Sequence, residues 1–87
     1  MNLRRFWFEF LPGRDLPPGL QSGCGVTAFD GEDARQILRK RVFGGDDPPI
    51  ARIVENVDVS SLDPGHVLPN LLPPNERGVW FPQGYPG

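Results

Sequence analysis

The sequence predicts a small α+β fold, a two-layer sandwich in which one amphipathic helix, residues 31–43, packs on a mainly antiparallel sheet. Three observations support this prediction: an alternating aromatic stretch near the N-terminus, one segment with a complete set of helix-end signals, and short strand-like stretches separated by long Pro-rich loops. We expect one domain over residues 1–87, because a chain of this length buries only about 60 to 65% of its unfolded surface and cannot build two cores.

The first predicted element is a strand from Leu3 to Leu11, where side-chain character alternates with a period of two. One face carries three phenylalanines and the other a tryptophan between two charged residues: Phe6, Phe8 and Phe10 against Arg5, Trp7 and Glu9. We expect the phenylalanine face in the core and Trp7 on a partly covered outer face.

A wide loop and a second strand follow. Residues 12–22 are rich in proline, which lacks a backbone donor and restrains its neighbour, so no regular element is expected there. Residues 23–29, GCGVTAF, resume a strand-like composition. The glycines on either side of Cys24 predict a bulge or a close backbone approach where this strand starts.

The helix is predicted by the stretch DGEDARQILRKRVFGG. Asp30 is placed to cap its N-terminus, acidic residues lie in the first turn and basic residues in the last, and Gly44 and Gly45 end it. An apolar stripe at helical spacing, which should pack on the sheet, consists of Ala34, Ile37, Leu38 and Val42. Three of the side chains expected in water are Arg35, Gln36 and Arg39.

Two further strands complete the prediction. Ile50 to Val59 reads as a strand after a turn at 46–49, and a bulge near Glu55 or Asn56 would explain why its apolar positions change parity. Prolines and turn formers exclude long elements over residues 60–77. Gly78 to Phe81 predicts a short last strand, placed at an edge because Pro82 follows.

The element order β-β-α-β-(β) also predicts a topology. A helix between the second and third strands makes those two strands run the same way, and the first strand between them gives an antiparallel sheet with a right-handed crossover. The helix covers one face of this sheet only. The other face must therefore be closed by the loops or by another molecule.

Charge and cysteine content limit the function. Nine basic and eleven acidic residues are dispersed along the chain, for a net charge of -2, so no basic field for nucleic acid is expected. A single Cys24 excludes an intramolecular disulfide and favours a reducing cytoplasm. The N-terminal stretch is a poor signal peptide, and no apolar run approaches the roughly 20 residues of a membrane span.

The only histidine, His66, lies in the stretch VDVSSLDPGHVLPN with Asp58 and Asp63. These side chains could bind a divalent metal, or His66 could act as the base of a Cys24 nucleophile with one of the aspartates as its orienter. The spacing is not that of a metal motif, and DPGH is typical of a turn. We therefore expect a connector whose polar groups bond its own backbone, with no catalytic residue, metal or cofactor.

The C-terminal stretch RGVWFPQGYPG concentrates residue types that anchor protein interfaces. The interface candidates, with the N-terminal tryptophan added, are Trp7, Arg77, Trp80, Phe81 and Tyr85. In so small a domain the alternative is that Trp80 and Phe81 complete the core on the face that the helix leaves open, and Trp7 could belong to either set.

Four blocks taken together, FWFEF, GCGVTAFDGEDA, VENVDVSSLDPGHVLPN and RGVWFPQGY, resemble a group of small bacterial proteins with no assigned activity. The resemblance covers most of the chain. It implies a bacterial, intracellular origin and a single domain, and it transfers no catalytic residue.

These observations predict a non-enzymatic protein-binding module, of the kind represented by immunity proteins and small inhibitors that dock on and block a partner. The alternative is a small hydrolase or metal-dependent enzyme that uses His66 with Asp58, Asp63 or Cys24. A third expectation is a homo-oligomer joined through an edge strand.

Overall fold

The computed structural model describes residues 2–13, 15–62, 64–65, 67 and 74–82. Four strands form one sheet: β1 (Arg4–Phe10), β2 (Cys24–Ala28), β3 (Ile50–Glu55) and β4 (Gly78–Phe81). One helix, α1 (Gly31–Arg41), lies between β2 and β3, and two short 3-10 helices, η1 (Leu20–Ser22) and η2 (Val59–Ser61), lie in the loops. The predicted α+β sandwich is confirmed.

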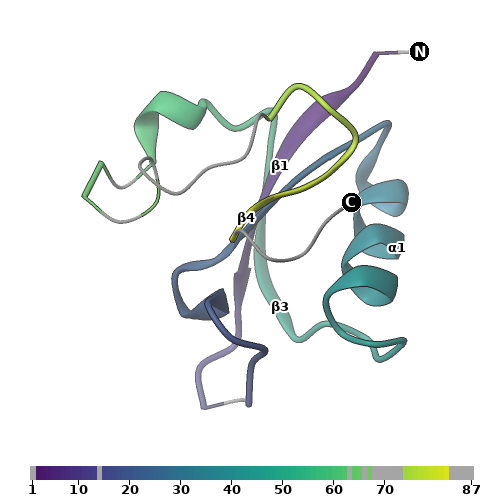
Figure 1. Ribbon diagram of the computed structural model, residues 1–87, viewed down its shortest axis with the longest axis vertical. Helices are drawn as coiled ribbons and strands as arrows, with labels where there is room; N and C mark the ends of the chain where they lie inside the picture. The colour runs from purple at the N-terminus through teal and green to yellow at the C-terminus, as the bar shows by residue number, and fades with distance from the viewer. Residues whose placement is uncertain (1, 14, 63, 66, 68–73, 83–87) are drawn as a thin grey trace.

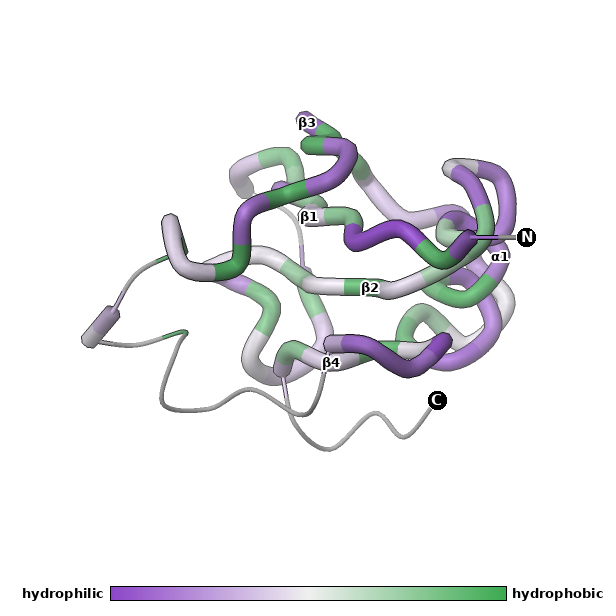
Figure 2. The backbone as a smooth tube through the Cα atoms, turned by 90° about the horizontal axis from the view of Figure 1, so that it is seen from above, coloured by the Kyte–Doolittle hydropathy of each residue, from purple (hydrophilic) through white to green (hydrophobic). Residues whose placement is uncertain are grey.

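The strand order is β3-β1-β2-β4, and all three neighbouring pairs are antiparallel. β2 and β3 therefore run the same way on either side of β1, as the position of the helix predicted. β4 forms one edge of the sheet, also as predicted, and β3 forms the other edge. Figure 2 shows the four strands in this order, with α1 level with β2 and β4 and away from β3.

The first turn of α1 has the predicted cap. The Asp30 carboxylate accepts a hydrogen bond from the Asp33 N–H at 2.8 Å, and the Asp33 carboxylate accepts one from the Phe29 N–H at 3.1 Å. These two bonds satisfy backbone donors that a helix start leaves free. The predicted C-terminus was two residues too long, because the helix ends at Arg41 and Val42 is its C-cap.

The helix side of the sheet holds the main core. Side chains of the first two strands, of η1 and of the α1 stripe meet there. The largest fully buried ones are Phe6, Phe8, Leu20, Leu38 and Val26. Partly buried residues pack around this cluster: Phe10, Leu16, Phe43, Ile50 and Ile53. The alternation of β1 thus puts its phenylalanines where the sequence predicted.

The other side of the sheet is closed by the chain itself. Trp7, Trp80 and Phe81 form a second buried cluster there, and it is covered by the segment after β3, through Val57, Val59, Leu62 and Val67. Figure 1 shows α1 on one side of the sheet and the segment with η2 on the other. Trp7 lies on the face opposite the phenylalanines, as predicted, but it is only 5% exposed, so the expectation that this face covers it only partly was wrong.

The third strand is shorter than predicted. β3 ends at Glu55, because Asn56 adopts a left-handed conformation with φ 52°. The Val57 N–H then bonds the Arg5 carbonyl at 3.1 Å, which keeps the chain beside β1 while the side-chain parity changes. This change in side-chain parity lies near Glu55 and Asn56, as predicted. The register shift of the β1–β3 pair, however, lies at Glu9/Phe10, at the opposite end of β3.

The close backbone approach predicted at β2 is confirmed at Gly25. A Cβ atom there would lie 2.5 Å from three ring carbons of Trp80, which packs directly on the glycine backbone. The register of the β2–β4 pair shifts at the same place, between Gly25 and Val26.

We predict that Gly25→Ala costs about 1 to 3 kcal/mol of stability, because the methyl group displaces a ring that is buried and cannot turn away. Gly31→Ala is the matched control, since its Cβ would meet nothing nearer than a Glu55 oxygen at 3.9 Å. Urea unfolding of both variants measures the difference. Equal midpoints would contradict the described packing of Trp80 on β2.

Candidate functional site

Cys24 lies at the start of β2 with its side chain in the helix-side core. It is fully buried, and desolvation raises the pKa of its thiol well above the usual range. A thiol in this setting stays protonated and out of reach of a substrate, whereas a nucleophilic cysteine needs an accessible thiolate.

Asp58 is the N-cap of η2, and its carboxylate is used locally. It accepts hydrogen bonds from the Ser60 hydroxyl at 2.7 Å and the Ser60 N–H at 3.0 Å, and both bonds lower the pKa of Asp58. The Ser61 hydroxyl donates to the Asp58 carbonyl at 2.6 Å. These contacts agree with a connector that bonds its own backbone. Asp63 and His66 lie outside the described residues.

Cys24 and Asp58 lie on opposite sides of the sheet. Cys24 belongs to the helix-side cluster, whereas Val59 of η2 and its C-cap Leu62, which follow Asp58, pack on the second cluster. The sheet therefore separates these two members of the predicted catalytic set. Within the described part of the chain, no group of three or more His, Cys, Asp or Glu side chains could hold a metal ion.

Three of the five interface candidates are core residues in this structure. The Trp7 ring centroid lies 6.0 Å from that of Trp80 and 5.7 Å from that of Phe81, and all three side chains are buried. The structure therefore places these three residues in the core, which was the alternative to an interface. Within the described part of the chain, the buried Trp80 Nε1 has no hydrogen-bond acceptor. Tyr85 lies outside the described residues.

Arg77, the remaining candidate, contacts the first turn of α1. Its Nε donates to one Asp33 carboxylate oxygen at 2.9 Å and its Nη2 to the other at 2.5 Å, while its guanidinium carbon lies 5.8 Å from the Phe29 ring centroid. This two-pronged pair joins the start of β4 to α1 across 44 positions of the chain. Its side chain remains 40% exposed.

This pair predicts a pH effect. The hydrogen bond from Arg77 is the main cause that lowers the pKa of Asp33. A carboxylate with a lowered pKa in the folded state adds stability above its unfolded value of about 3.9, and this contribution is lost as the pH falls through the folded pKa. Arg77→Ala should therefore raise the pKa of Asp33 and flatten the loss of stability below about pH 4.

Carbon-13 NMR titration of the Asp33 carboxyl in wild type and Arg77→Ala measures this shift directly. Asp58 is the internal control, because its pKa is lowered by Ser60 and should not change. An Asp33 pKa that is the same in both proteins would show that the pair does not form in solution.

A shallow hollow of about 400 Å³, which was not predicted from the sequence, lies on the outer surface of α1. It is lined by four helix residues and by the turn before β3: Glu32, Arg35, Gln36, Arg39, Asp47 and Pro48. The helix residues follow the spacing i, i+3, i+4 and i+7 and so share one face. This spacing was visible in the sequence, but the return of the turn at 46–49 beside the helix was not.

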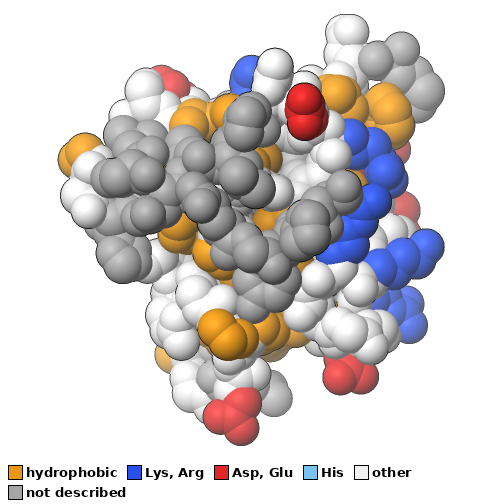
Figure 3. Space-filling model, in the orientation of Figure 1, with side chains coloured by type: hydrophobic (Ala, Val, Ile, Leu, Met, Phe, Trp, Pro, Cys, Tyr) orange, Lys and Arg blue, Asp and Glu red, His pale blue; other side chains and the backbone are white. Residues whose placement is uncertain are grey.

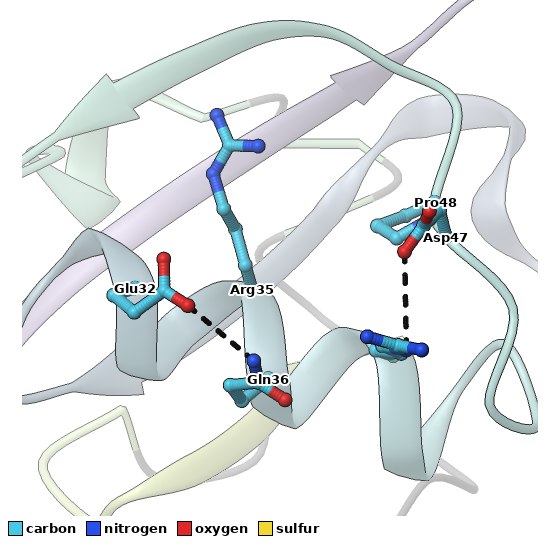
Figure 4. Close-up of a pocket in the computed structure, with 6 residues that line it drawn as sticks. Glu32, Arg35, Gln36, Asp47 and Pro48 are labelled. Atoms are coloured by element: carbon cyan, nitrogen blue, oxygen red, sulfur yellow. Dashed lines mark hydrogen bonds and ion pairs between the residues drawn. The ribbon is translucent and has the colours of Figure 1, made fainter.

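Most polar groups around this hollow already have partners. Gln36 donates to Glu32 at 3.3 Å, and the Arg39 Nε donates to the Gly45 carbonyl at 2.9 Å and lies 3.8 Å from an Asp47 oxygen. Arg35 differs, because its guanidinium makes no hydrogen bond or ion pair with any residue in the described ranges. Figure 4 shows it extending from the helix between Glu32 and the Asp47–Pro48 turn.

The hollow borders the edge of the sheet that α1 leaves open. The helix lies over β2 and β4, so Ile50 and Ile53 on the helix side of β3 are only half-buried. Pro48 of the hollow leads directly into β3. We name the hollow together with Ile50 and Ile53 the α1–β3 surface. Figure 3 shows that Lys and Arg side chains gather on the α1 side of the molecule.

None of the helices in the described ranges combines the length and the apolar character that crossing a membrane requires. Comparison of the chain with protein-family models, with curated proteins and with solved structures gives no significant match in any of the three.

Proposed function

We propose that this chain is a non-enzymatic protein-binding module that docks on a protein partner and holds or blocks it, as immunity proteins and inhibitors do. The observation that carries the proposal is the α1–β3 surface. There an edge strand with half-buried isoleucines lies beside a hollow in which Arg35 has no partner within the described residues. Arginine beside apolar area is typical of protein interfaces.

The location of this surface differs from the one expected from sequence. The second face of the sheet is closed by the chain itself, so the aromatic residues at the two chain ends offer little area to a partner. The described residues with large exposed hydrophobic side chains are Leu3, Leu11 and Phe29, and each is about 40% exposed or less. The proposal therefore depends on the α1–β3 surface and not on the aromatic cluster.

The enzyme alternative receives less support from the described residues. Cys24 is buried and is separated from Asp58 by the sheet, and the Asp58 carboxylate is held by Ser60. A hydrolase or metal enzyme would then depend on His66 with Asp58 or Asp63. His66→Ala distinguishes the two functions, because a binding module keeps its partner after this change and an enzyme loses its activity.

Self-association through β3 is the second binding alternative. Pro48 and Pro49 precede this edge strand and the exposed Arg52 lies within it, and such residues discourage strand-to-strand pairing. A partner of a different sequence is therefore the occupant that we propose. Sedimentation of the purified chain tests this choice, and a stable dimer that Ile53→Arg dissociates would favour the second copy.

The decisive experiment is site-specific photo-crosslinking in the source cells, followed by reconstitution with the purified crosslinked protein. A photoreactive residue replaces Gln36 on the α1–β3 surface, or Arg52 as the control on the opposite side of the sheet. We expect one specific product from position 36. The purified complex should be disrupted by Ile53→Arg and kept by Arg52→Gln, which removes only an exposed contact to Glu9.

A product from position 52 alone, or equal binding of the Ile53→Arg protein, would contradict the proposed surface. Circular dichroism and urea unfolding of each variant establish that a loss of binding does not come from a loss of the fold.

A further inference from the structure

We infer that the α1–β3 surface binds an extended acidic segment of the partner. Arg35 and the neighbouring Arg39 donate hydrogen bonds to the carboxylates of this segment. This inference rests on the proposed function and adds the chemistry that the partner must present.

Arg35 is the side chain of the α1–β3 surface whose donors are free to bind an anion. Its guanidinium offers five N–H donors in a planar fork, and none of them is used by a described residue. The carboxylates nearest along the hollow have other partners: Glu32 accepts from Gln36, and Asp47 lies beside Arg39. A carboxylate brought by a partner would form the paired hydrogen bonds that a guanidinium prefers.

Arg39 supplies a second donor in a fixed position. Its Nε is bound to the Gly45 carbonyl at 2.9 Å, which orients the guanidinium before any ligand arrives. Its two terminal Nη groups have no hydrogen bond to a residue of the described ranges. The side chains of Arg35 and Arg39 are four positions apart on the helix, which separates their Cβ atoms by about 5 to 6 Å.

This spacing matches an extended chain with acidic residues two positions apart. Side chains on one face of a strand repeat every two residues, or about 6.6 to 6.8 Å. A segment lying along the edge of the sheet beside β3 could therefore direct one carboxylate to each arginine. Its apolar positions would meet Ile50 and Ile53.

The charges around the hollow do not favour a nucleic acid. Glu32 and Asp47 stand beside the two arginines, so the rim of the hollow is neutral in total. The net charge of -2 provides no wider basic field of the kind that binds a chain of phosphates. A protein segment is therefore favoured over a nucleic acid.

The test is an NMR titration of the arginine Nε–H signals with defined probes. The main probe is the capped peptide Ala-Glu-Ala-Glu-Ala; the same peptide with Gln for Glu, capped trialanine with a free C-terminal carboxylate, and inorganic phosphate are the comparisons. We expect saturable shifts of Arg35 and Arg39 with the Glu peptide, and weaker binding as salt is added. A stronger effect of trialanine would assign the site to a chain terminus instead of side chains.

Arg35→Gln should weaken binding of the Glu peptide by at least about tenfold, because a charge-assisted hydrogen-bond pair is lost. Arg52→Gln on the other side of the sheet should leave it unchanged. Equal binding of the Gln peptide, tighter binding of phosphate, or wild-type affinity of the Arg35→Gln protein would overturn the inference.

The two proposals fail in different ways. If crosslinking finds a partner on the α1–β3 surface and Arg35→Gln binds that purified partner as tightly as wild type, carboxylate recognition is wrong and the binding function stands. If neither position 36 nor position 52 gives a crosslinked product, the binding function itself fails.

Discussion

Trp80→Ala should destabilise the fold by about 3 to 5 kcal/mol, the largest effect that we expect from a single substitution. Trp80 is 1% exposed, packs on the Gly25 backbone and contacts Trp7 in the second core. Its removal leaves a cavity beneath the segment that covers this cluster through Val57, Val59, Leu62 and Val67. Urea unfolding followed by circular dichroism measures the loss.

Trp80→Phe is the control for this substitution. The indole N–H has no acceptor among the described residues, so phenylalanine loses volume without breaking a described hydrogen bond. We expect Trp80→Phe to cost clearly less than Trp80→Ala. Equal costs would point to a role of the indole nitrogen that the described contacts do not contain.

Leu38→Ala should cost about 2 to 5 kcal/mol, since it truncates a fully buried side chain between α1 and the sheet. This is a large share of the stability of a domain of this size, which is of the order of 5 to 10 kcal/mol. Arg35→Ala, on the exposed face of the same helix, is the matched control and should stay within about 0.5 kcal/mol of wild type. A wild-type urea midpoint for Leu38→Ala would contradict the register of the helix.

Binding and stability should separate along this helix. Leu38 belongs to the buried side of α1 and Arg35 to the hollow on its outer side. Leu38→Ala is therefore expected to change the unfolding midpoint, whereas Arg35→Gln is expected to change carboxylate binding at an unchanged midpoint. This contrast keeps the function tests independent of fold stability.

Local patterns in the sequence were sufficient for β1, α1 and the sheet topology. Three signals act within a few residues and can be recognised without the rest of the fold. They are the period of two from Leu3 to Leu11, the cap at Asp30 and the glycines after Phe43. The helix between β2 and β3 then fixed the relative direction of these strands. The close approach at Gly25 was predicted as well, although its partner Trp80 was not.

Other features depended on residues that are distant in the chain. The end of β3 was misplaced because a left-handed Asn56 leaves the apolar pattern nearly unchanged. The burial of Trp7 depends on Trp80, Phe81 and the segment around η2. The Arg77–Asp33 pair joins the residue before β4 to the first turn of α1. The hydrophobic periodicity of the sequence carries no information about contacts between such distant residues.

The sequence by itself therefore determined that one amphipathic helix covers one side of an antiparallel sheet with β1 at its centre, because hydrophobic period and end signals are local properties. Only the tertiary structure decided what closes the second side and which side chains stay free. The chain there folds back on the tryptophans, and the surface that we propose for a partner therefore lies at the edge between α1 and β3. The physical reason is that burial and pairing are set by neighbours in space, and here those neighbours come from opposite ends of the chain.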